Sequence, residues 1–112
     1  MKREEFLDMM ADRYKYDMGP CSTRAGFAQV DTGQDASYFG TWANPERLII
    51  VCYCEGDVTI DRHDTPEGFA RAIRELKAWN EESGHGFKGI DAMMVDSIKE
   101  GFQGLGLGDL LH

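Results

Sequence analysis

The run 37-SYFGTWANPERLIIVCYC-54 decides the fold. Its two arms, residues 37–43 and 48–54, are rich in aromatic and β-branched side chains, and the NPER segment between them is a good turn sequence. We therefore expect an antiparallel hairpin over residues 37–54. The second arm continues through Glu55-Gly56-Asp57 into VTIDRH at 58–63, which should add a further strand and make a meander.

Helical patterns flank this ribbon on both sides. Residues 2–16 carry apolar side chains at helical spacing, and residues 65–83 begin with a hydroxyl cap, a proline and an acid. Residues 91–102 form a third amphipathic pattern, whereas 23–31 is a weak strand candidate diluted by glycine and alanine. The expected fold is α+β: an antiparallel three- or four-stranded β-meander, with an N-terminal helix and two C-terminal helices packed on one face.

Length and composition indicate one domain, over residues 1–112. The chain of 112 residues is 42% hydrophobic, and the glycine-rich stretch 103–112 should form a loose tail. No apolar run reaches the ~20 residues of a membrane span and the N-terminus lacks a signal peptide's apolar centre, so we expect a cytoplasmic protein that does not bind membranes. Three cysteines form no disulfide framework and read as reduced thiols. The net charge of −8 disfavours direct nucleic-acid binding.

The register of the two hairpins decides which side chains share a face of the sheet. A four-residue turn at 44–47 pairs Ala43 with Leu48, and a three-residue loop at 55–57 pairs Cys54 with Val58. A two-residue loop would instead place the Asp61 carboxylate on an apolar face beside Ile50, where burial is costly. The three-residue loop is therefore expected, with the inner face of the sheet packed under the helices. The expected outer face carries Tyr38, Trp42, Ile49, Val51, Tyr53, Thr59, Asp61 and His63.

This outer face is too apolar to be left wholly in contact with water. The first strand, a helix, the C-terminal tail or a second copy in a homodimer would each cover it. A site for another protein or a ligand is the alternative, with Tyr38, Trp42 and Tyr53 as anchors and Asp61 and His63 as their polar neighbours.

Acidic residues recur at four-residue spacing along the expected N-terminal helix, at Glu4, Asp8 and Asp12. Like charges in this arrangement mildly destabilise a helix. They form either a solvated face or a surface that attracts a basic partner.

Catalytic and metal-binding patterns are weak. Asp61 and His63, two apart on one strand, could position a general base or a metal, but no convergent nucleophile accompanies them. The preferred register also puts the thiols of Cys52 and Cys54 on the face opposite to that pair, and we predict neither a metal nor a cofactor. A small enzyme or metal-dependent protein centred on Asp61 and His63 remains the alternative hypothesis.

The stretch YFGTWANPERLIIVCYCEGDV at 38–58, with KGID at 88–91, resembles small uncharacterised proteins encoded in bacterial phage, plasmid and other accessory regions. This resemblance implies no particular activity, but small inhibitors of host machinery occur in that class. The hypothesis is therefore a non-catalytic binding protein, a mobile-element accessory protein that binds or inhibits a host macromolecule through the aromatic sheet face and an acidic surface.

Overall fold

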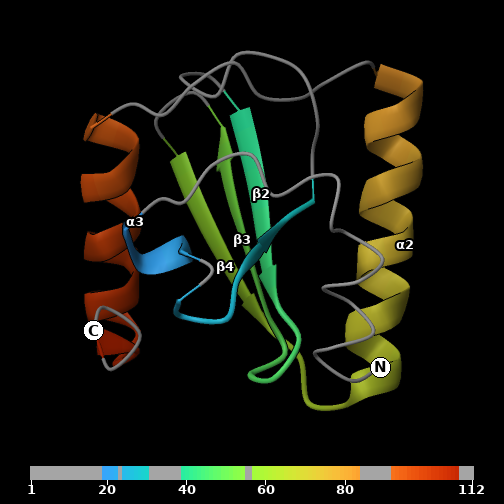
Figure 1. The fold of residues 1–112 in the computed structure, drawn as a ribbon, viewed down its shortest axis with the longest axis horizontal. Coiled ribbons are helices and arrows are strands. Elements are labelled where there is room, and N and C mark those ends of the chain that lie inside the picture. The colour runs from blue at the N-terminus through green and yellow to red at the C-terminus, as the bar shows by residue number, and fades with distance from the viewer. Residues whose placement is uncertain (1–18, 23, 31–38, 55–56, 84–91, 109–112) are drawn as a thin grey trace.

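A computed structural model describes residues 19–22, 24–30, 39–54, 57–83 and 92–108 (Figure 1). Within these ranges the chain forms a four-stranded antiparallel sheet with strand order β1-β2-β3-β4 and two α-helices, so the α+β class and the meander are confirmed. The expected N-terminal helix lies outside the described residues, and none of the described helices is long and apolar enough to cross a membrane. The elements are η2 (Gly19–Cys21), β1 (Ala28–Gln29), β2 (Phe39–Asn44), β3 (Ile49–Cys54), β4 (Asp57–Arg62), α2 (Pro66–Ser83) and α3 (Ala92–Gly104).

The first hairpin joins β2 to β3 through a turn that Asn44 organises. Its Oδ1 atom accepts hydrogen bonds from the backbone N–H groups of Glu46, at 3.0 Å, and Arg47, at 3.1 Å. Its side-chain N–H group donates to the carbonyl of Ala25, at 3.0 Å, and so ties the turn to the chain before β1. Asn44 pairs with Ile49, which displaces the register by two residues from the expected one. A shift of two keeps every side chain on its expected face, so the predicted sharing of faces is confirmed for this hairpin.

The second hairpin has the register that the sequence argument rejected. Cys54 pairs with Asp57 across a two-residue connection, so the expected three-residue loop is wrong. Val58 and Ile60 consequently share a face with Val51, while Asp57, Thr59 and Asp61 share the face of Ile50. The physical reason is that this face of the sheet is not covered along its whole width. β4 is an edge strand of the described sheet, and its Asp61 is exposed.

The two helices cover opposite faces of the sheet (Figure 1). On one face, α3 packs through Ile98 and Phe102 against a cluster that includes Trp42. On the other, α2 packs through Phe69 and Ile73 against Ala28, Val30, Ala43 and Ile50. The expected arrangement with both helices on one face is therefore wrong. Because β3 is apolar on both sides, each side needs its own cover, as in any sheet buried between two layers of helix.

Helix α2 begins as its sequence predicts. The hydroxyl of Thr65 accepts a hydrogen bond from the N–H group of Gly68 at 3.1 Å, which satisfies one of the free donors of the first turn. Pro66 follows at the first helical position and Glu67 lies in the first turn, where its charge favours the helix dipole. This cap fixes where α2 leaves the end of β4.

Helix α3 ends in a Schellman motif at Gly106, whose φ is 74°. The N–H group of Gly106 donates to the carbonyl of Gln103 at 3.1 Å, and that of Leu107 donates to the carbonyl of Phe102 at 2.8 Å. Leu107 is buried in the same cluster as Phe102. Within the expected loose tail, residues 103–104 belong to α3 and Leu107 is buried, whereas Leu105 and Gly106 are exposed; 109–112 lie outside the described residues.

The chain before β1 completes the α3 side of the core. Phe27 stacks on Phe102 with ring centroids 5.9 Å apart, and Cys21 lies in the same cluster. Ala28 pairs with Ala43 of β2, so the weak strand candidate at 23–31 does form a strand, over two residues.

Candidate functional site

The predicted aromatic anchors do not lie on an open surface. Trp42 is 0% exposed and Tyr53 is 5% exposed, because both lie under α3 with Ile98 and Phe102. The structure thus covers this face with a helix, which was the ordinary alternative to a docking site. Tyr38, Glu4, Asp8 and Asp12 lie outside the described residues.

The other two predicted site residues, Asp61 and His63, line a pocket between the sheet and α2. Its volume is about 420 Å³, within the ~300–1,000 Å³ typical of ligand sites. We call it the α2 pocket, and the described residues that line it are Ile50, Cys52, Asp61, His63, Ala72, Glu75 and Leu76.

Two elements of the sheet and one helix build the walls of the α2 pocket. Asp61 lies directly across from Ile50 on the neighbouring strand, and Cys52 follows on the same face. Ala72, Glu75 and Leu76 are spaced by three and four residues, which brings them together on one side of α2. The sheet thus supplies one carboxylate and the helix supplies the other.

Polarity divides the lining into a floor and a mouth. Ile50 is buried and Leu76 is half-buried, so the floor is apolar. The carboxylates of Asp61 and Glu75 belong to exposed residues and are available to solvent at the mouth. An occupant that is apolar along its length and positively charged at its end would match this distribution.

His63 follows β4 and is held against the start of α2. Its backbone N–H group donates to the carbonyl of Leu48 at 2.8 Å. Its ring meets Phe69 edge-on, with centroids 6.2 Å apart and an angle of 75° between the planes. The Nε2 atom is buried and has no hydrogen-bond partner among the described residues. Such a nitrogen loses its water without recovering a bond, at a cost of ~1–3 kcal/mol.

The three cysteines differ in exposure, and all of them lie in described parts of the chain without a disulfide. Cys52 is half-buried in the pocket wall, and its Sγ accepts a hydrogen bond from the Thr41 hydroxyl at 3.7 Å. Cys54 is exposed, whereas burial raises the pKa of the Cys21 thiol well above its ordinary value. Cys52 is therefore the thiol that belongs to the candidate site.

The expectation that the thiols and the Asp61–His63 pair lie on opposite faces is wrong, because the two-residue connection puts Cys52 and Asp61 on one face. Gly56, in the connection between these strands, is the residue type that tight hairpin turns favour. Across the described ranges, no group of three or more His, Cys, Asp and Glu side chains is arranged to hold a metal ion.

Sequence reasoning missed the helical wall of the pocket. In the sequence, Glu75 is one of several charged residues whose sign alternates along the surface of α2, and nothing local distinguishes it from Glu67 or Arg71. Its signal was its position beside Ala72 and Leu76, at the border of the apolar stripe of the helix. Comparisons with protein-family models, curated proteins and solved structures give no match.

Proposed function

We propose that this is a non-catalytic binding protein that docks on a basic segment of another protein through the α2 pocket. The single observation that carries the proposal is the pocket itself, about 420 Å³ in volume, with an apolar floor and a carboxylate on each of two facing elements. The aromatic face is covered by α3, so the acidic surface remains the candidate contact.

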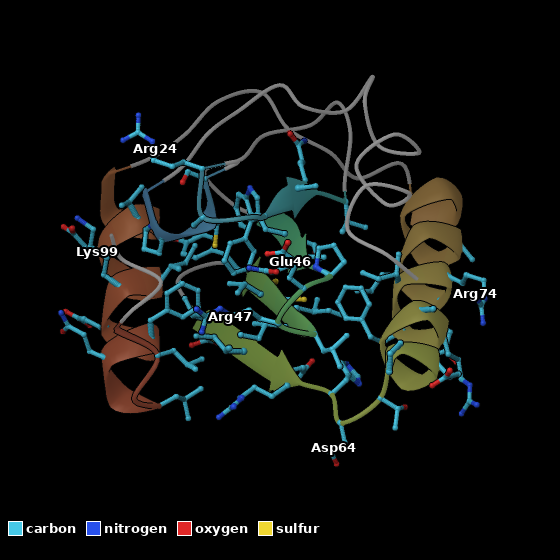
Figure 2. All side chains as sticks on the ribbon, turned by 60° about the horizontal axis from the view of Figure 1, so that its bottom comes forward. Arg24, Glu46, Arg47, Asp64, Arg74 and Lys99 are labelled. Carbon is cyan, nitrogen blue, oxygen red and sulfur yellow. The ribbon has the colours of Figure 1, made fainter. Side chains whose placement is uncertain are left out.

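The charge distribution supports a basic partner. The chain carries a net charge of −8, which attracts cations and speeds their encounter with the pocket. Neither Arg71 nor Arg74 of α2 lines the pocket, and Figure 2 shows Arg74 on the side of the helix that faces away from the sheet. Two carboxylates therefore meet solvent at the mouth, and the lining residues that the structure describes include no lysine or arginine.

A protein is the occupant that we favour over a free amine. The likeness of residues 38–58 to accessory proteins of phages and plasmids supports a host macromolecule as the target. In this proposal Glu4, Asp8 and Asp12 add long-range attraction for the same basic surface. Three cysteines without a disulfide fit the reducing conditions of the cytoplasm, where such a target would be met.

A pair of synthetic peptides tests the proposal. A peptide that alternates basic and aliphatic residues, and a matched peptide with glutamate at the basic positions, are titrated into the full chain and followed by fluorescence anisotropy. The basic peptide should bind, should weaken with added salt, and should lose about tenfold in affinity in the Asp61→Asn, Glu75→Gln double variant.

The control variant removes two charges elsewhere. Asp57 lies on the same face of β4 outside the pocket, and Glu100 is exposed on α3, so Asp57→Asn, Glu100→Gln changes the net charge equally. If the two double variants lose affinity for the basic peptide equally, net charge alone would explain the effect, and the pocket would not be the docking site. Light scattering at the same concentrations identifies a homodimer, the other form of association.

A small enzyme or metal-dependent protein centred on Asp61 and His63 is the second candidate. The observation that favours it is that both residues line one pocket together with Cys52 and Glu75. Such a mixture of titratable groups in a concave site is typical of active sites. Elemental analysis of the purified protein discriminates between the candidates: stoichiometric zinc, iron or manganese would favour this one over simple docking.

A further inference from the structure

The α2 pocket restricts the chemistry of its occupant further than to a positive charge. Resting on the proposed function, we propose that the pocket takes an arginine side chain, with its guanidinium group between Asp61 and Glu75 and its aliphatic stem over Ile50, Ala72 and Leu76. Lysine carries the same charge on a similar stem, so the inference depends on the acceptors that the pocket presents.

The acceptors come from different directions. Asp61 reaches the pocket from β4, Glu75 from α2, and His63 from the segment that joins them. A guanidinium group has five N–H donors in a planar fork and can meet two carboxylates at once, whereas an ammonium group is a compact point charge. Guanidinium is also the more weakly hydrated cation, which lowers the cost of entering a pocket with an apolar floor.

The unpartnered nitrogen of His63 adds an acceptor that favours a ligand with several donors. Nε2 is buried beside the pocket and lacks a partner among the described residues. In the neutral ring with the proton on Nδ1, Nε2 accepts a hydrogen bond. A donor of the bound guanidinium that reaches this atom would recover the lost hydrogen bond.

Two small cations of matched length separate the alternatives. n-Butylguanidinium and n-pentylammonium chloride are titrated into the full ¹⁵N-labelled chain, and the amide signals of Cys52, Asp61 and His63 are followed by NMR. We expect butylguanidinium to bind about tenfold more tightly. Asp61→Asn and Glu75→Gln should each weaken it by about fivefold, and Asp57→Asn and Glu100→Gln by less than about twofold.

The outcomes distinguish this inference from the proposed function. Equal affinities of the two cations, both weakened by Asp61→Asn, would overturn the preference for guanidinium and leave the acidic pocket intact. Signals that move outside the pocket, or that do not respond to either cation, would overturn both. A thermal melt of each variant checks that it is folded, since both carboxylates belong to exposed residues and their amides preserve shape.

Discussion

Asp61 lies directly opposite Ile50 across the β3–β4 pair, so an exposed carboxylate and a buried aliphatic side chain share one face of the sheet and one pocket. This relationship follows from the two-residue connection between Cys54 and Asp57. Because β4 is an edge strand, α2 covers Ile50 but leaves Asp61 in contact with solvent. The same register turns Ile60 under α3.

A pair of substitutions at neighbouring positions tests this register. Asp61→Val should leave the free energy of unfolding unchanged or raise it by less than about 1 kcal/mol, because valine favours strands and would lie beside Ile50 at an exposed position. Ile60→Asp should lower it by about 3 kcal/mol or more, because its carboxylate would be forced against α3, where Ile60 now packs. Urea unfolding measures both. If Asp61→Val destabilised the fold more than Ile60→Asp, the result would support the three-residue loop instead.

Trp42 is a core residue, and its truncation should show this. Trp42→Ala should destabilise the fold by about 3–5 kcal/mol, because the indole is 0% exposed beneath α3. An anchor on an open face would instead lose partner binding while the fold stayed intact. Chemical unfolding followed by circular dichroism decides between these outcomes. A change below about 1 kcal/mol would contradict the packing described for α3.

The sequence predicts the first hairpin well because its turn chemistry is local. The Asn44 amide holds the turn and Pro45 limits where it can begin, so the sharing of faces follows from residues close together in the chain. The second hairpin depends on a choice between loops of two and three residues. That choice rested on the cost of burying Asp61, which only the position of α2 could settle.

The assignment of the aromatic face failed for a related reason. The run Ile49-Ile50-Val51 is continuously apolar, which indicates a strand buried on both sides, but the expected fold placed every helix on one side. The apolar stripe of α3, with Ile98 and Phe102, indicates that one side of the helix is buried. It does not indicate which face of the sheet the helix covers. The pocket could not be predicted because its walls meet only when α2 lies on the side of Asp61.

Two glycines near the end of α3 should respond to alanine in opposite directions. Gly106 has a φ of 74°, which alanine adopts poorly, so Gly106→Ala should destabilise the fold by about 1 kcal/mol. Gly104 lies in the helix, and a methyl group there would meet no atom within 4 Å from the rest of the described structure beyond its own helical turn, so Gly104→Ala should stabilise the fold by about 0.5–1 kcal/mol. Thermal melts of the two variants give the signs. Two changes of the same sign would contradict the helix end seen here.

The raised pKa of the buried Cys21 thiol predicts how stability depends on pH. At a pH between the unfolded and folded pKa values, the folded state keeps a proton on the thiol that the unfolded state has lost. The free energy of unfolding therefore falls as pH rises above about 8.5, the ordinary pKa of cysteine. The slope is at most about 1.4 kcal/mol per pH unit. Cys21→Ala should lack this part of the slope. Equal slopes in urea unfolding of the two proteins between neutral and alkaline pH would refute the prediction.

Substitution of His63 should affect the stability of the fold and the selectivity of binding differently. His63→Phe keeps a ring of similar size against Phe69 and removes the buried nitrogen that has no partner among the described residues. Because an unsatisfied buried polar atom costs ~1–3 kcal/mol, the variant should be as stable as the parent or more stable. Its preference for butylguanidinium over pentylammonium should fall toward equality, since the acceptor that rewards additional donors is gone. A stable variant with an undiminished preference would show that the carboxylates alone select the cation, while a destabilised variant would mean that Nε2 has a partner in the native protein.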